Sequence, residues 1–175
     1  EIFEVFLASY YSFVALYNPP KFKSLNRAVS NMRERHGGSM HPIGPSGLRA
    51  IIKALKSGKI SALLPDQVPN LESGAIQSEF FGNNIRYMSL IYKLLKLTPS
   101  EVLIGSVTRR LEKGTLEYEL CFEKPDDLVY SEKKGEHIRA VTDAIERVVV
   151  RSPKQYQWEY KIFKNRQDFD PYQDT

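Results

Sequence analysis

An acid and an amide stand directly behind an apolar run in the first half of this chain. Residues 60–64 (ISALL) predict a buried strand that stops at Pro65, and Asp66 and Gln67 follow at once. In α/β proteins, functional side chains gather at the carboxyl ends of the strands. Asp66 and Gln67 are therefore candidates for a polar pair at a binding crevice, although an Asp after a Pro is also a common turn residue. A polar loop should follow and be closed by Phe80, Phe81 and Gly82.

Two arginines follow another apolar run, residues 102–107 (VLIGSV). If that run is a strand of the same sheet, Arg109 and Arg110 lie at the same edge as Asp66. A guanidinium group there could hold a carboxylate or a phosphate through two parallel hydrogen bonds. We expect Asp66 to pair with one of these arginines.

A second pair, Arg33 and Arg35, lies near the end of a predicted helix over residues 24–35. Side chains two positions apart point to different faces of a helix, so at most one of the two should reach a shared site. Cations at a helix C-terminus are also stabilising in themselves, by about 0.3–1 kcal/mol. Both interpretations stay open: one of the two arginines reaches a binding site, or the pair stabilises the end of the helix.

The histidines do not reveal a catalyst by their spacing. His36 and His41 lie in a glycine-rich loop without a second ligand at metal-binding spacing, and His137 lies on an apolar helical face, where a structural role is expected. The nucleophile elbow, the phosphate-binding loop and the dinucleotide fingerprint are all missing. Cys121 is the only cysteine, so no intrachain disulfide can form, and its apolar neighbours predict an inert core residue.

Composition narrows the class of protein without choosing a function. The 175 residues are 42% hydrophobic and 26% charged, which suits one globular domain with a core. The net charge of +4 favours acidic partners, namely phosphates, anionic membrane surfaces or acidic carrier proteins, but it is also what solvated lysines would give. No stretch approaches the roughly 20 apolar residues of a membrane span.

Strands and helices should alternate along the chain and hold these side chains in place. Period-3.6 patterns predict helices, one of them capped by Ser46, and short apolar runs predict strands. Residues 112–114 (EKG) read as a hairpin turn between two antiparallel strands. The expected fold class is α/β, with a mostly parallel central sheet flanked by helices and a possible antiparallel pair near residues 102–122. The predicted helices cover residues 2–10, 24–35, 46–56, 88–95 and 137–149, and the predicted strands cover residues 13–17, 60–64, 102–107 and 116–122.

Several segments, in this order, resemble the bacterial acyltransferases that add the late acyl chains in lipid A biosynthesis. The resemblance runs from residue 1 to about residue 166, and it implies a glycerolphosphate-acyltransferase-like fold. Residues 167–175 are expected to form a disordered tail. The segments that carry the resemblance are Glu1 with Ile2, residues 15–21 (ALYNPPK), 32–35 (MRER), 48–58 (LRAIIKALKSG), 64–69 (LPDQVP), 80–82 (FFG), 109–111 (RRL) and 152–164 (SPKQYQWEYKIFK).

The defining motif of that family is a histidine followed, five positions on, by a glutamate or aspartate. Glu1 and Ile2 fit the end of this motif. The resemblance therefore implies that Glu1 is the catalytic carboxylate and that the histidine precedes it by five positions, outside this chain. It also implies that residues 1–166 are the C-terminal part of an acyltransferase domain, inactive alone, with a membrane-anchoring helix further upstream.

In that family the acyl donor is a thioester on acyl carrier protein, and the acceptor is a hydroxyl on a phosphorylated glycolipid. The histidine would take the proton of the hydroxyl while the carboxylate orients the imidazole. Arg33, Arg35 or a backbone amide would stabilise the thioester oxygen, and Arg109 would contact acceptor phosphates. Asp66 with Gln67 would organise the site edge, and the Phe80–Phe81 pair would form a wall of the lipid site.

The resemblance also implies a location and a set of partners. The enzyme would work at the cytoplasmic face of the inner membrane, on a membrane surface, with no cofactor, no metal and no nucleic acid. Two alternatives remain: an acyltransferase for another glycolipid, such as an ornithine lipid or a phosphatidylinositol mannoside, or a non-catalytic basic module that binds membrane lipids or nucleic acid. The interleaved aromatic and basic residues of 155–166 (QYQWEYKIFKNR) suggest the second, but their helix-compatible pattern is also typical of a core.

Overall fold

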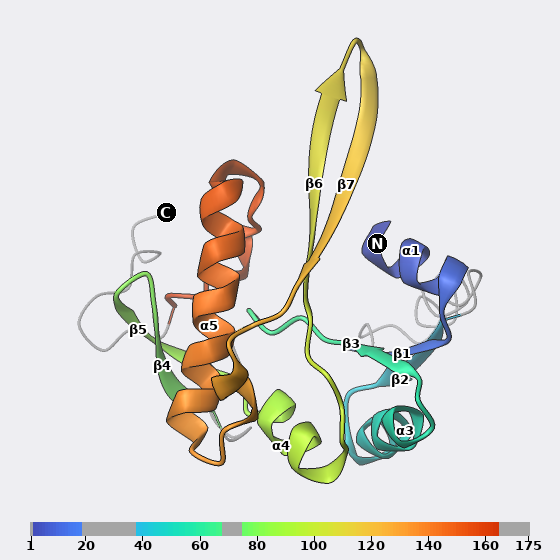
Figure 1. Ribbon diagram of the computed structural model, residues 1–175, viewed down its shortest axis with the longest axis vertical. Helices are drawn as coiled ribbons and strands as arrows, with labels where there is room; N and C mark the ends of the chain where they lie inside the picture. Colours follow the sequence, from blue (N-terminus) through green and yellow to red (C-terminus); the bar gives the residue numbers. More distant parts are fainter. Residues whose placement is uncertain (1, 19–37, 68–74, 165–175) are drawn as a thin grey trace. The chain divides into compact units, whose positions relative to one another are not determined.

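The computed structural model describes residues 2–18, 38–67 and 75–164. The chain divides into two compact units: unit 1 comprises Glu1–Leu63 and Leu97–Ser100, and unit 2 comprises Leu64–Lys96 and Glu101–Thr175. The polypeptide therefore passes from one unit to the other after Leu63, after Lys96 and after Ser100. Figure 1 shows the elements of both units. The predicted helix over residues 24–35 and the predicted tail lie outside the described residues.

Unit 1 contains a three-stranded parallel sheet in the order β2-β1-β3. In the register, Val14 lies opposite Ser39, and Phe13 lies opposite Ile60. The predicted helix over residues 2–10 and the predicted strand over residues 13–17 are confirmed, whereas the strand predicted over 60–64 is shorter. The elements are α1 (Ile2–Tyr10), β1 (Phe13–Tyr17), β2 (Ser39–Pro42), α3 (Pro45–Lys56) and β3 (Ile60–Ala62).

Helix α3 begins earlier than its sequence pattern predicts. Gly44 is the N-cap, with φ 147°, and Pro45 occupies the first turn, so the prediction of Ser46 as the cap is wrong. Proline suits this place because the first N–H groups of a helix have no partner within the helix. At Gly47 a Cβ atom would lie 2.3 Å from the Pro42 carbonyl oxygen, so the glycine lets α3 pack closely beside β2.

The core of unit 1 forms where α1 packs on the sheet. Phe13 is 1% exposed, and it belongs to a cluster of buried residues with Leu7, Ala15, Tyr17 and Met40. The pattern of β1, in which four of five residues are buried, explains why a short apolar run here forms a strand with both faces covered.

Unit 2 begins with a hairpin that the sequence pattern does not predict. Strands β4 (Ile76–Phe80) and β5 (Asn83–Tyr87) pair antiparallel. Phe81 and Gly82 form the two-residue turn, with φ angles of 49° and 69°. Positive φ at both central residues matches the right-handed twist of a hairpin. The prediction of a loop up to Phe80 is therefore wrong for the described residues from 76 onward.

Helix α5 (Lys134–Arg151) covers the β4–β5 hairpin and forms the core of unit 2 with it. The buried side chains of this core include Phe80, Ile85 and Tyr87 from the hairpin and Val141 and Ile145 from the helix. The predicted helix over 137–149 is confirmed, since α5 spans these residues and ends at Arg151 with Ser152 as its C-cap. Helix α4 (Leu90–Leu97), which is also as predicted, precedes this core, and the short helices η1 (Asp127–Tyr130), η2 (Pro153–Gln155) and η3 (Trp158–Tyr160) flank α5.

The antiparallel pair predicted near residues 102–122 is confirmed. It comprises β6 (Ile104–Glu112) and β7 (Thr115–Glu123), joined by a turn at Lys113 and Gly114. Two details differ from the prediction. Strand β6 continues past Arg109 and Arg110, and among the described strands it pairs with β7 alone. Over the described residues the fold is thus α/β, with one parallel three-stranded sheet and two antiparallel pairs in place of a single mostly parallel sheet.

Candidate functional site

The sequence-predicted site residues fall into two groups. Glu1, Arg33 and Arg35 lie outside the described residues. The others all belong to unit 2: Asp66 and Gln67 in the turn after β3, Phe80 and Phe81 at the end of the β4–β5 hairpin, and Arg109 within β6.

Asp66 is half-buried and contacts a tyrosine. The Tyr156 hydroxyl donates a hydrogen bond to its carboxylate. Burial raises the pKa of Asp66, and hydrogen bonds from its own backbone N–H and from Tyr156 lower it again in part. Tyr87, at the end of β5, is 2% exposed, and its pKa is raised well above the usual value by burial and then by the negative charges of Asp66 and Tyr156. Asp66 therefore forms a buried polar cluster with two tyrosines.

The expected pairing of Asp66 with an arginine is wrong within the described part of the chain. The groups that shift its pKa include no arginine. Arg110 instead forms an ion pair with Glu119 on the neighbouring strand, at 2.5 Å. The prediction failed because it ended the strand before Arg109; β6 continues, so both arginines lie in the middle of a ladder.

Aromatic side chains surround the Phe80–Phe81 pair. The two rings meet edge to face with centroids 4.7 Å apart. Phe80 also lies near the rings of Tyr156, at 6.2 Å, and Phe163, at 6.1 Å, while Phe81 lies 6.4 Å from Trp158. Phe80 is fully buried and Phe81 is half-buried. Only Phe81 of this pair keeps exposed surface.

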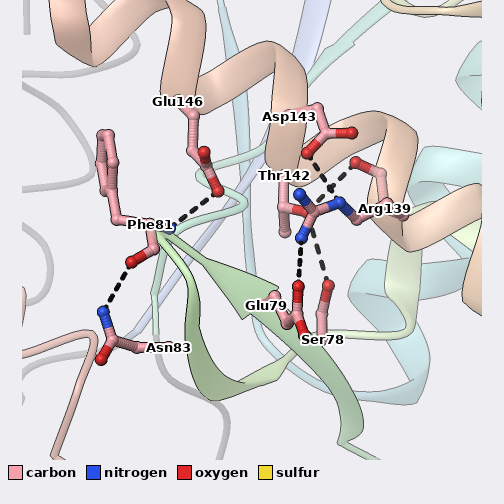
Figure 2. Close-up of polar contacts among 8 residues, drawn as sticks. All are labelled: Ser78, Glu79, Phe81, Asn83, Arg139, Thr142, Asp143 and Glu146. Carbon is pink, nitrogen blue, oxygen red and sulfur yellow. Dashed lines mark hydrogen bonds and ion pairs between the residues drawn. The ribbon is translucent and has the colours of Figure 1, made fainter.

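A carboxylate from α5 holds the turn that presents Phe81 (Figure 2). The backbone N–H of Phe81 donates to Oε1 of Glu146 at 2.8 Å, and Asn83 Nδ2 donates to the Phe81 carbonyl oxygen at 2.7 Å. A non-glycine residue at φ 49° is strained, at a cost of about 1–2 kcal/mol, so these contacts stabilise a conformation that Phe81 would otherwise avoid.

Further polar contacts fix the same hairpin to the helix. Arg139 contacts Glu79 at 3.0 Å and Asp143 at 2.8 Å, and the hydroxyls of Ser78 and Thr142 lie 3.4 Å apart (Figure 2). The exposed ion pairs contribute little stability, but together with Glu146 they fix the register of the hairpin along α5.

Gln155 connects the segment after α5 to β6. Its side-chain oxygen accepts from the Arg109 N–H at 2.7 Å, and its amide donates to the Arg109 carbonyl oxygen at 3.1 Å. The oxygen and the nitrogen of the Gln155 side-chain amide thus both bind the backbone of a single residue, Arg109. Trp158, three residues on, donates from Nε1 to the Pro153 carbonyl oxygen at 2.9 Å and packs edge to face on Tyr156 at 4.7 Å.

Four segments that are distant in the sequence therefore meet in unit 2. Residues 153–158 touch Asp66 through Tyr156, the 80–81 turn through Tyr156 and Trp158, and β6 through Gln155. We call these four segments the aromatic junction. Tyr156 is its centre, because its ring packs on Phe80 while its hydroxyl meets Asp66.

Comparison with known proteins identifies the family of the chain. The sequence-family model of the bacterial lipid A biosynthesis acyltransferases matches residues 1–165. The chain belongs to this family. It is 27% identical over 157 residues to a lipid A biosynthesis acyltransferase of Haemophilus influenzae, covering 88% of this chain and 46% of the relative. It is 26% identical over 153 residues to the lipid A biosynthesis palmitoleoyltransferase of Escherichia coli, covering 87% of this chain and 48% of the relative.

The chain thus spans about half the length of the curated relatives it matches. Its four converging segments are among the eight on which the sequence resemblance rests. Sequence reasoning missed Tyr87, Glu146 and the double contact of Gln155. Only the position of Gln155 inside residues 152–164, a segment of the resemblance, signalled that it matters.

The histidines among the described residues contact backbone or side-chain groups of their own units. His137 is 2% exposed, its Nδ1 contacts the Val129 carbonyl oxygen, and burial lowers its pKa. This agrees with the structural role expected for it in a helix, although the side chain is fully buried where partial burial was predicted. His41 lies 3.0 Å from the Ser39 hydroxyl on β2. Cys121 is half-buried in β7, so its prediction as a core residue is wrong.

The described residues offer neither a metal-binding cluster nor a membrane-spanning helix. No group of three or more His, Cys, Asp or Glu side chains among them could hold a metal ion. None of the helices in that part of the chain is long and apolar enough to span a membrane.

Proposed function

We propose that this chain is the C-terminal part of an O-acyltransferase that moves a fatty acyl chain from acyl carrier protein to a hydroxyl of a lipid A precursor. The match of the family model to residues 1–165 carries the proposal. The printed names of the relatives, a lipid A biosynthesis acyltransferase and a palmitoleoyltransferase, support the transfer of an acyl group.

In the proposed reaction, Glu1 is the carboxylate of the His-x4-Glu motif. The histidine five positions before it removes the proton from the acceptor hydroxyl while the oxygen attacks the thioester carbonyl. Glu1 orients the imidazole and stabilises its charged form. The new ester bond forms, the carbon–sulfur bond breaks, and the histidine returns the proton to the thiolate of the carrier. Arg33, Arg35 or a backbone amide stabilises the developing oxyanion.

The aromatic junction supplies the acceptor side of the proposed site. Phe80 is fully buried, so its part is to hold the wall, and half-buried Phe81 is the ring that contacts lipid. Asp66 organises the turn through Tyr156, which leaves the exposed Gln67 free to face the substrate. Arg109, whose backbone is held by Gln155, is proposed to contact an acceptor phosphate.

The proposed setting is the cytoplasmic face of the inner membrane, with the protein bound at or anchored in the membrane surface. The net charge of +4 suits a phosphorylated acceptor and an acidic carrier protein. No cofactor enters the proposed reaction, because the thioester already activates the acyl group.

The decisive experiment measures acyl transfer from acyl carrier protein to a lipid A precursor, with a protein that extends upstream of Glu1 and includes the histidine. Glu1→Ala should lower kcat by about 100-fold or more, because the imidazole loses its orienting partner. A matched control is Glu4→Ala, an acidic residue in the first turn of α1. Full activity in Glu1→Ala would remove Glu1 from the mechanism, and a residue other than histidine five positions upstream would remove the motif.

A further inference from the structure

The β6–β7 hairpin has two faces of opposite character. Its register places Val107 opposite Leu120, Arg109 opposite Tyr118, and Leu111 opposite Leu116. Side chains of directly opposed residues lie on the same face of a ribbon, and successive residues alternate between faces. One face therefore consists of apolar side chains with a single arginine. We call it the apolar face; it consists of Gly105, Val107, Arg109, Leu111, Leu116, Tyr118, Leu120 and Phe122.

Much of the apolar face is exposed to solvent. Leu111 is 75% exposed and Leu116 is 54% exposed at the distal end, and Phe122 and Tyr118 are 44% and 39% exposed nearer the base. In the other hairpin, β4–β5, the equivalent side chains pack under α5 and are buried. Contiguous exposed apolar side chains of this kind mark an interaction surface.

The base of the β6–β7 hairpin is attached to the rest of unit 2. Arg147 and Arg151 form ion pairs with Glu123 at the base, and Gln155 holds the backbone of Arg109 in the middle of β6. The distal residues around the Lys113–Gly114 turn are all exposed. The hairpin is therefore a ribbon held from its base to Arg109, with its turn at the far end (Figure 1). The exposed leucines of the apolar face, Leu111 and Leu116, flank that turn.

The charges are sorted between the two faces. Glu112, Glu117, Glu119 and Glu123 all lie on the face opposite the apolar one, as the register with Thr115, Arg110, Thr108 and Ile104 shows. There Arg110 pairs with Glu119. The only charged residue of the apolar face is Arg109, and Lys113 lies in the turn at the tip. The apolar face thus combines exposed leucines and aromatics with positive charge and excludes every carboxylate of the hairpin.

We propose that the apolar face of the β6–β7 hairpin docks on the interfacial region of a phospholipid bilayer that contains anionic lipids. The leucines enter the boundary of the acyl chains, Tyr118 lies at the level of the headgroups, and Arg109 and Lys113 contact phosphates. The four glutamates face away from the bilayer. The inference rests on the proposed function, whose acceptor is a membrane lipid, and it names the element that brings the protein to it.

A second copy of the chain fits this surface less well. Two apolar faces stacked on each other would bring two Arg109 side chains into a shared apolar layer without a carboxylate from either ribbon. A bilayer surface instead offers a phosphate to each arginine. This difference in charge complementarity favours the bilayer.

The test uses an environment-sensitive fluorophore on the full 175-residue chain. In a Cys121→Ser background, Leu116→Cys and Thr115→Cys each carry the label at neighbouring residues on opposite faces. The vesicles are phosphatidylethanolamine with phosphatidylglycerol, or phosphatidylcholine alone. We expect a blue shift at position 116 and none at 115, with a weaker response on phosphatidylcholine. Equal shifts at both positions, or none at either, would overturn the proposal.

Vesicle co-sedimentation gives an independent readout. Leu111→Ser with Leu116→Ser should weaken binding at least about tenfold. The matched control, Leu103→Ser with Leu128→Ser, removes two leucines that are 51% and 50% exposed elsewhere in unit 2 and should leave binding unchanged. If the first pair lowers the melting temperature while vesicle binding persists, the apolar face is covered by protein and the proposal is wrong. Neither assay needs acyl transfer, so failure here leaves the proposed reaction testable on its own.

Discussion

Glu146 offers the sharpest test of how the aromatic junction is held. Its carboxylate accepts the Phe81 N–H at 2.8 Å and so stabilises a turn with φ angles of 49° and 69°. A hydrogen bond to a charged group contributes about 1.5–3 kcal/mol, and because both partners are only half-buried we expect the lower part of that range. Glu146→Ala should therefore lower the free energy of unfolding by about 1–2 kcal/mol. In a chain of this size that corresponds to roughly 2–8 °C in melting temperature.

The single tryptophan makes the measurement direct. Trp158 lies 6.4 Å from Phe81, so its fluorescence during urea denaturation reports on this junction. Glu146→Gln keeps an acceptor oxygen without the charge and should lose about half as much stability. Glu159→Ala, on an exposed side chain of η3, is the control. If Glu146→Ala is as stable as the parent chain, or if Glu159→Ala loses as much, the account of the turn is refuted.

Three further predictions concern the same unit. Because the pKa of Asp66 is raised, the stability that its protonated form contributes is complete below the unfolded value of 3.8 and is lost as pH rises through the folded value. The stability of the parent relative to Asp66→Asn should therefore fall as pH rises above 3.8 in urea denaturation, and a pH-independent difference would contradict this. Gln155→Ala should speed amide exchange at Arg109 by up to about fivefold with a stability loss of about 1 kcal/mol or less, and unchanged exchange would disprove the double contact. Gly82→Ala, where a new Cβ would meet nothing within 4 Å, should cost about 1–2 kcal/mol of unfolding free energy through φ alone, and a neutral effect would show that the turn relaxes.

The elements with strong periodicity were predictable from the sequence. The helix α5 follows from apolar residues at helical spacing that stop at Ser152 and Pro153, and β1 follows from five consecutive apolar residues before a turn. The β6–β7 turn was predictable because Gly114 follows Lys113 between two alternating runs. In each case the local pattern and the packing agree.

The β4–β5 hairpin was not predictable in the same way. Its turn residues are Phe81 and Gly82, whereas an Asn or Asp before the glycine is the usual signal for this turn type. Phe81 accepts its positive φ because Glu146, 65 positions away, binds its N–H. A contact between residues so far apart leaves no trace in the local pattern.

For the candidate site, the sequence identified the residues but not the contacts between them. The sequence singled out Asp66, Phe80, Phe81 and residues 152–164 through resemblance to a family, and the structure brings these together. Their contacts could not be predicted. Asp66 was expected beside an arginine, and the group that meets it is Tyr156, because the path of β6 is decided by its register with β7 and by Gln155.

The route of the chain between its two units limits how the protein can be dissected genetically. Residues Leu97–Ser100 belong to unit 1, yet they are encoded between two stretches of unit 2. Thr98 is 3% exposed and its hydroxyl lies 2.9 Å from that of Ser100, so this insertion is an ordered part of unit 1. A stop codon after Leu63 would remove it, and a start codon at Leu64 would leave it without the rest of its unit. The first half of the gene therefore cannot encode a complete unit 1, and the second half encodes all of unit 2 together with a short piece of unit 1. Random insertions should be tolerated at the tip of β6–β7 before they are tolerated at any of the three crossings.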